Sequence, residues 1–342
     1  MRIATLAFLL AAASAPVLAQ PATTAPGAAP ASAITDMEAV VVSGVQPGPG
    51  MWKVSSGSHV LWVLGVQSPL PKNMQWQSPE VEAAIAQSQE VLEQPGLHIG
   101  ITPGGIFRAM FSVPTLLNAR KLPDDKTLQD VLPPDLYLRW SQMQPRYLSR
   151  NKEDVERWRP VFAAQALYDA AIFQTGLENG AVAEKVTTLA KAHKVKLSST
   201  SLSAQVTKPK AVAEGLTQSL DNAPLDEIAC FRATMDRLDS DVAATVARAN
   251  AWAVGDIQEM TRLMRGNDLQ ACIKAISEAE VMRSLGLDNV RSKVDAKWLA
   301  AAEAALSRNT SSFAVLPMSH LLRTGGYLDR LQAEGYVVEA PE

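Results

Sequence analysis

MWKV at residues 51–54, followed by VLWVL at residues 60–64, decides the fold class of this 342-residue chain. Both segments are rich in aromatic, β-branched and leucine residues and flank the turn sequence SSGS, which predicts two neighbouring strands. The second segment is apolar on both of its faces, as expected for a strand that other layers cover on both sides. It ends at Gly65, where the chain becomes polar and rich in proline.

Strand character returns at the other end of the chain. The pattern predicts a buried strand at 312–316 (SFAVL), a short helix at 326–333 and a closing strand at 336–339 (YVVE). The middle of the chain is mainly helical, and its clearest helix covers 226–252, where apolar residues recur at steps of three and four. We therefore predict an α/β domain over residues 48–342: a central mixed sheet formed by the N- and C-terminal segments, with a large, mainly helical insertion at about 124–309.

A helix is also predicted after the first two strands. Pro79 and Glu80 suit its first turn, because proline lacks an N–H that would be unpaired there and glutamate faces the positive end of the helix dipole. We expect this helix to run to Leu92 and to end at Glu93, before QPG at 94–96 breaks it. LHIGI at 97–101 then predicts a short strand.

The first nineteen residues have the pattern of a secretory signal peptide. Arg2 precedes an apolar run from Ile3 to Ala13, and a small-residue cleavage sequence ends at Ala19. Residues 20–47 are rich in proline and alanine, so we expect a disordered linker. The apolar run is too short to span a bilayer. We expect a periplasmic or secreted protein that is cleaved near Ala19 and has no stable membrane insertion after signal removal.

The net charge limits the possible partners of the protein, and the two cysteines raise the question of a disulfide. The formal net charge is −3 and no basic run is present, which argues against nucleic acid as a partner. An oxidising compartment would allow Cys230 and Cys272 to form a structural disulfide, which is the interpretation that we favour; two buried thiols are the alternative.

Several spaced elements together resemble the TraB/GumN (Tiki-like) family over about residues 48–340. They are a tryptophan-lysine strand followed by a leucine-rich strand, a helix that ends in a carboxylate, a leucine-proline segment, a tryptophan…glycine-aspartate junction and a last strand-helix-strand unit. In this chain they correspond to GPGMWKVS at 48–55 with LWVLG at 61–65, Leu92-Glu93, Leu122-Pro123 with Leu128 and Leu132, AWAVGD at 251–256, and FAV at 313–315 with His320 and GYVVE at 335–339.

The resemblance implies a metal-dependent hydrolytic site with two Gly-x-x-His motifs and acidic residues, and this chain departs from it at four places. They are Gly65-Val66-Gln67-Ser68 with serine for histidine, Pro317-Met318-Ser319-His320 with proline for glycine, KLSST at 196–200 with serine at a glutamate position, and Val294-Asp295 in place of an arginine-asparagine pair. Glu93 and His320 remain as the candidate catalytic and metal-binding residues. Gly65, Ser68 and Ser319 mark the altered motifs.

One histidine and one glutamate fall short of the roughly three protein ligands of a catalytic zinc. The leading hypothesis is therefore an exported family member with little or no hydrolase activity that binds an envelope protein or peptide or has a regulatory role. No cofactor is expected; a divalent metal is the alternative, in a divergent hydrolase that uses Glu93, His320 and either His98 or an aspartate. A third hypothesis is a structural partner-binding domain, whose helical insertion supplies the interface.

Overall fold

A computed structural model of the chain describes residues 48–72, 74–76, 79–102, 114, 117–149, 154–222, 224–264 and 289–341. Residues 1–47, which include the predicted signal peptide and linker, and Cys272 lie outside the described residues. Among the helices of the described part, none combines the length and the apolar character that crossing a membrane requires.

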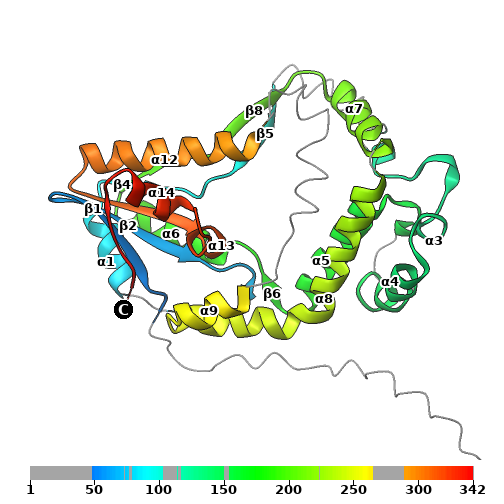
Figure 1. Ribbon diagram of the computed structural model, residues 1–342, viewed down its shortest axis with the longest axis horizontal. Helices are drawn as coiled ribbons and strands as arrows, with labels where there is room; N and C mark the ends of the chain where they lie inside the picture. The colour runs from blue at the N-terminus through cyan, green and yellow to red at the C-terminus, as the bar shows by residue number, and fades with distance from the viewer. Residues whose placement is uncertain are drawn as a thin grey trace, which may run out of the picture. The chain divides into compact units, whose positions relative to one another are not determined.

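A six-stranded sheet forms the centre of the fold, in the order β10-β1-β2-β9-β4-β7. Figure 1 labels strands β1, β2 and β4 of this sheet. Strands β2, β9, β4 and β7 are parallel, and β1 is antiparallel to both of its neighbours. The bounds are β1 Met51–Ser56, β2 His59–Val66, β4 Glu90–Leu92, β7 Lys196–Ser198, β9 Ser311–Pro317 and β10 Val337–Glu339. The predicted α/β class with a central mixed sheet is confirmed, and β7, which lies within the predicted helical insertion, also belongs to this sheet.

Two small sheets accompany the main one. β3 (Leu70–Pro71) pairs with β6 (Leu177–Glu178) in antiparallel fashion, and β5 (Leu97–Ile101) pairs with β8 (Leu202–Val206) in parallel. The strand predicted at 97–101 is therefore present, although it does not belong to the central sheet.

The helices lie in two groups according to the core that they help to form. Those around the sheet are α1 (Pro79–Gln87), α6 (Ala181–Ala192), α9 (Ile257–Met264), α12 (Val290–Arg308), α13 (Met318–Leu321) and α14 (Tyr327–Ala333). Helix α12 contacts β1, β2, β9 and β4 and can be followed along the sheet in Figure 1. Apolar side chains of β2 and β9, such as Leu61 and Phe313, are fully buried beneath these helices.

A second core lies among helices of the middle segment. Its elements are α3 (Leu128–Val131), α4 (Pro134–Tyr147), the short 3-10 helix Val155–Arg157, α5 (Pro160–Gln174) and the first half of α8 (Pro224–Ala253). Phe231 and Met235 of α8 are fully buried here, whereas Ala249 and Trp252 of the same helix belong to the sheet core. The apolar pattern predicted for 226–252 therefore serves two cores along a helix of about 45 Å. Helix α7 (Pro209–Asp221) and the 3-10 helix Pro123–Asp125 complete the described elements.

The prediction that one helix runs from Pro79 to Leu92 is wrong. Helix α1 ends at Gln87, where the backbone N–H of Ser88 donates to the carbonyl of Ile85 and its hydroxyl donates to the carbonyl of Ala84. The next residues form β4, which lies between β9 and β7 and is buried along its whole length. Glu93 therefore follows a central strand and not a helix.

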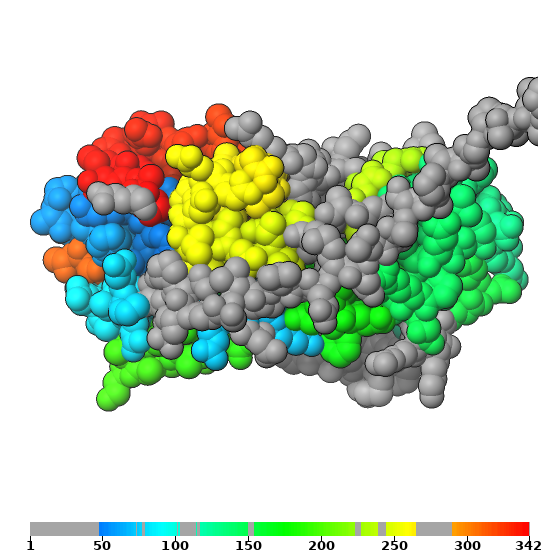
Figure 2. Space-filling view, turned by 90° about the horizontal axis from the view of Figure 1, so that it is seen from below, coloured from blue at the N-terminus to red at the C-terminus, as the bar shows by residue number. Residues whose placement is uncertain are grey.

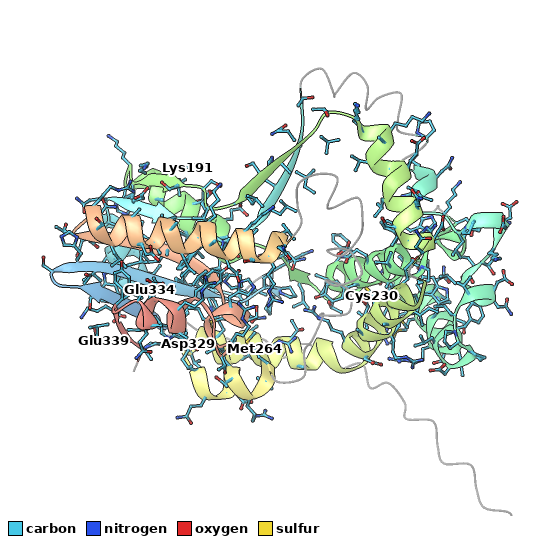
Figure 3. The ribbon with its side chains drawn as sticks, turned by 45° about the horizontal axis from the view of Figure 1, so that its top comes forward. Lys191, Cys230, Met264, Asp329, Glu334 and Glu339 are labelled. Carbon is cyan, nitrogen blue, oxygen red and sulfur yellow. The ribbon has the colours of Figure 1, made fainter. Side chains whose placement is uncertain are left out.

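Cys230, labelled in Figure 3, lies on α8 and is 3% exposed. It packs in a small buried cluster with Val161 and Leu220. Because Cys272 is outside the described residues, the disulfide between these two cysteines stays a prediction.

Candidate functional site

A cavity of about 790 Å³ lies at the carboxyl ends of the parallel strands. Its described lining comes from the residues that follow β2 and β9, from Gln94 after β4, from the first residues of α6 and α12, and from α8 and α9. In a parallel sheet, ligands bind at this edge because the loops that leave the strands diverge there. Ser68, Ser319 and His320, predicted from the altered motifs, all line the cavity.

Gly65 is buried one residue before the end of β2 and is required by close packing. A Cβ atom at this position would lie 2.1 Å from Sδ of Met318 and 2.8 Å from Cδ1 of Leu321, both in α13. Its carbonyl also accepts a hydrogen bond of 2.7 Å from Nε1 of the buried Trp252. Glycine thus allows α13, which carries His320, to pack directly on the strand.

Ser68 stabilises the start of helix α6. Its hydroxyl donates to Oδ1 of Asn179 at 3.1 Å and accepts a hydrogen bond from the backbone N–H of Gly180, the residue that precedes α6, at 3.3 Å. Ser68 therefore links the end of β2 to a helix that begins at the cavity. Ser319 is solvent-exposed in α13.

His320 has an environment that disfavours its charged form. Burial lowers the pKa of this imidazole, and the positive charges of Arg323 and Arg291 lower it further, while Asp295 opposes them. Its ring lies 5.6 Å from the ring of Tyr327, centroid to centroid. Its Nδ1 is buried without a hydrogen-bond partner among the residues that the structure describes.

Asp295 and Tyr327 form a polar pair next to His320 that the sequence analysis did not identify as site residues. The hydroxyl of Tyr327 donates to Oδ1 of Asp295 at 2.6 Å. Burial is the largest cause that raises the pKa of Tyr327, and the hydrogen bond to Asp295 raises it further. Arg323 and Arg330 each place a guanidinium nitrogen near Oδ2 of Asp295, at 3.8 Å and 4.0 Å. The only sequence signal was the departure from the family pattern at Val294-Asp295.

Four arginines line the cavity, and none of them is predicted as a site residue from the sequence. Arg237 and Arg248 come from α8, Arg291 from the start of α12, and Arg323 from the loop after α13. No aspartate or glutamate occurs among the lining residues within the described ranges. Arg237 and Arg248 are eleven residues apart, about three helical turns, so they share one face of α8. That spacing is the signal that could have identified them.

Glu93 follows β4 at the same edge of the sheet. Its backbone N–H donates to the carbonyl of Ser198 at 3.0 Å, and its carbonyl accepts from the hydroxyl of Thr200 at 2.8 Å. The lining residue at this position is its neighbour Gln94. The role of Glu93 as a ligand or catalyst therefore stays a prediction.

The metal site that the family resemblance implies does not fit the described residues. Within the ranges that the structure describes, no group of three or more His, Cys, Asp or Glu side chains could hold an ion. The cavity combines His320 with serine and glutamine side chains and four guanidinium groups. His98 is exposed on β5, and His59 lies at the opposite end of the sheet, with Nδ1 2.6 Å from the carbonyl oxygen of Leu306.

Comparison with known proteins supports the resemblance noted from the sequence. The model of the TraB/PrgY/gumN family matches residues 50–340. Neither the curated proteins nor the solved structures contain a significant match. Since the family match covers most of the chain, including every strand of the central sheet, the protein belongs to the TraB/PrgY/gumN family.

Proposed function

We propose that this TraB/PrgY/gumN protein is an exported binding or regulatory protein of the cell envelope with little or no metal-dependent hydrolase activity. The observation that carries the proposal is the lining of the cavity at the carboxyl end of the sheet, where four arginines accompany the retained His320. Positive charges in one partly enclosed space repel a divalent cation. A hydrolytic metal would also need about three protein ligands.

Metal content together with hydrolysis tests this proposal. Protein purified without chelator is expected to hold far less than one equivalent of Mn, Co or Zn, and added metal is expected to produce no cleavage of a casein substrate. His320→Ala should leave these results unchanged, because the proposed function includes no bound metal to lose. His193→Ala is the matched control, since His193 lies outside the cavity, 3.4 Å from Glu82. One equivalent of metal, present in wild type and His193→Ala but lost in His320→Ala, would overturn the proposal.

A divergent metal-dependent hydrolase is the second candidate, and one observation favours it. Glu93 and His320 follow β4 and β9, which are adjacent parallel strands, so both residues leave the sheet at the same edge. The metal measurement above distinguishes the two candidates, and Glu93→Gln extends it. The hydrolase requires that Glu93→Gln lowers metal occupancy or cleavage, whereas the binding protein requires no change in either.

Export is a separate part of the proposal and rests on the signal-peptide pattern of residues 1–19. The protein recovered from a periplasmic fraction is expected to begin near Gln20, and deletion of residues 2–19 should retain it in the cytoplasm. Recovery of an uncleaved chain from the cytoplasm alone would contradict this part.

A further inference from the structure

The cavity gathers positive charge from elements that are far apart in the sequence. Arg291 and Arg323 lie near His320 at the strand ends, as their effects on the pKa of that residue indicate, and Arg237 and Arg248 extend along α8. Since the two arginines of α8 are eleven residues apart, their Cα atoms are separated by about 16 Å along the helix axis. Cationic groups are thus spread over the length of a small-molecule ligand.

Three of the four arginines are in contact with neighbouring groups that restrict their positions. Arg248 is 3% exposed and donates to the hydroxyl of the buried Thr245 at 2.8 Å. Arg237 lies over the ring of Tyr168, 4.8 Å from its centroid. Arg323 lies 3.8 Å from Asp295, a carboxylate that borders this region without lining the cavity. Guanidinium groups with fixed orientations suit bidentate binding of carboxylate or phosphate.

Two further features favour an anion. Helix α6 begins at the cavity, where Gly180, Val182 and Ala183 line it, and the amino end of a helix carries a partial positive charge. His320 also lines the cavity, and a neutral imidazole keeps one N–H that can donate to an anion. The volume of about 790 Å³ lies within the range of small-molecule sites. Met264, the last residue of α9, also lines the cavity and is labelled in Figure 3.

From these observations we infer that the cavity binds a small organic anion that carries two or more carboxylate or phosphate groups. Arg291 and Arg323 hold one anionic group beside His320, and Arg237 and Arg248 bind the remainder of the ligand. This inference rests on the proposed function, because it names the class of ligand that the binding protein takes.

Titration calorimetry of the full mature chain with two probes tests the inference. Tricarballylate supplies carboxylates, inorganic pyrophosphate supplies phosphates, and the uncharged triamide of tricarballylic acid serves as the reference ligand, all at constant ionic strength. At least one anionic probe should bind with one-to-one stoichiometry, and the triamide should not. Comparison of the two anionic probes shows which group the site prefers.

Three substitutions then locate the binding. The double variant Arg291→Gln/Arg323→Gln removes two charges from the cavity, and we expect at least tenfold weaker binding of the preferred probe. Arg330→Gln is the matched control, because Arg330 lies 4.0 Å from the same Asp295 but does not line the cavity; its affinity should stay within twofold of wild type. These three arginines are at least partly exposed, so the variants should fold, and circular dichroism verifies this.

Each alternative result has a defined meaning. No binding of either anionic probe to the wild type, equal weakening by Arg330→Gln, or unchanged binding in the double variant would overturn the inference. Failure of the proposed function is a separate outcome: a stoichiometric metal bound through His320 would refute the non-hydrolytic proposal even if the anions bind as expected. Conversely, if the protein contains no metal and binds neither anionic probe, only the proposed ligand class is refuted.

Discussion

The two ends of the central sheet differ in the charged groups that they contain. At the amino end, Glu90 is the first residue of β4 and is 4% exposed, and its carboxylate accepts hydrogen bonds from surrounding donors. These donors are Lys196, Ser198, Arg308 and Asn309. At the carboxyl end, four arginines and His320 line an open cavity without an acidic lining residue in the described ranges.

This contrast separates a structural site from a ligand site. Burial alone would raise the pKa of Glu90, but the hydrogen bonds from Lys196, Ser198 and Asn309 outweigh it and lower that pKa to about 2. The amino end thus contains both signs of charge and needs no further partner. The carboxyl end gathers four guanidinium groups around an open cavity, which is the arrangement that suits a bound anion. Figure 2 shows the end of α8 and helix α9 in yellow. They lie beside the blue and red segments, which belong to the two ends of the described chain.

Loss of the Glu90 carboxylate should produce the largest effect on stability. Glu90→Ala removes the acceptor of at least four donors, and we expect a loss of about 3 kcal/mol in the free energy of unfolding. Lys196 and Arg308 are largely exposed and regain water, which keeps the cost at the low end of the range for broken buried pairs. Urea unfolding at neutral pH measures it. The matched variant Glu93→Ala at the other end should change stability by less than about 0.5 kcal/mol; equal losses would erase the distinction between the two ends.

Acid sensitivity sharpens the same comparison. Because the pKa of Glu90 is lowered from 4.5 to about 2 in the folded protein, its contribution is fully present above pH 4.5 and is lost as the pH falls toward 2. The free energy of unfolding of Glu90→Ala should therefore decline less steeply than that of wild type in this window. Parallel pH profiles for the two proteins would show that the carboxylate is not held in its charged form.

Gly65→Ala should have the next largest effect, since it inserts a methyl group where Sδ of Met318 would lie 2.1 Å away. We expect a loss of about 2 kcal/mol from overpacking, together with weaker anion binding, because α13 must shift. Gly57→Ala is the control: it has no atom within 4 Å of the added Cβ, and its φ of +58° costs about 1 kcal/mol without affecting the cavity. Unchanged anion binding in Gly65→Ala would show that α13 does not position the site.

His320 should give the smallest effect, in a different pH range. Burial lowers its pKa below the ordinary 6.5, so below that pH the unfolded chain takes up a proton that the folded protein resists. Wild type should therefore lose stability as the pH falls from about 7.5 to about 5.5, and His320→Gln should lose less. The unfolding free energies at these two pH values provide the measurement. A steeper loss in His320→Gln would mean that the imidazole is stabilised in its charged form.

The long apolar runs made the frame of the fold predictable. β2 and β9 are continuous apolar strands near the two ends of the chain, and their pairing placed Ser68 and His320 at one edge. The sequence predicts a helix where β4 lies, because EVL at 90–92 is too short for its periodicity to distinguish strand from helix. The pairing of these three residues with β9 and β7 in the folded protein makes them a strand.

The ligand-binding chemistry of the cavity was harder to predict. Arg237, Arg248, Arg291 and Arg323 are distributed over 87 positions, and single arginines are ordinary surface residues in any sequence. The fold collects them, because α8 and the start of α12 both reach the edge where β9 ends. Asp295 and Tyr327 were missed for the same reason, since they become neighbours only when α12 and α14 pack together.

A crystal structure of the protein soaked separately with the preferred anionic probe, tricarballylate or pyrophosphate, and with Mn²⁺ tests the central claim most directly. We predict that this anion lies between the guanidinium groups of Arg291 and Arg323 next to His320, and that the cavity contains no ordered Mn²⁺. Mn²⁺ coordinated by His320 and Glu93, with no anion at the arginines, would contradict it.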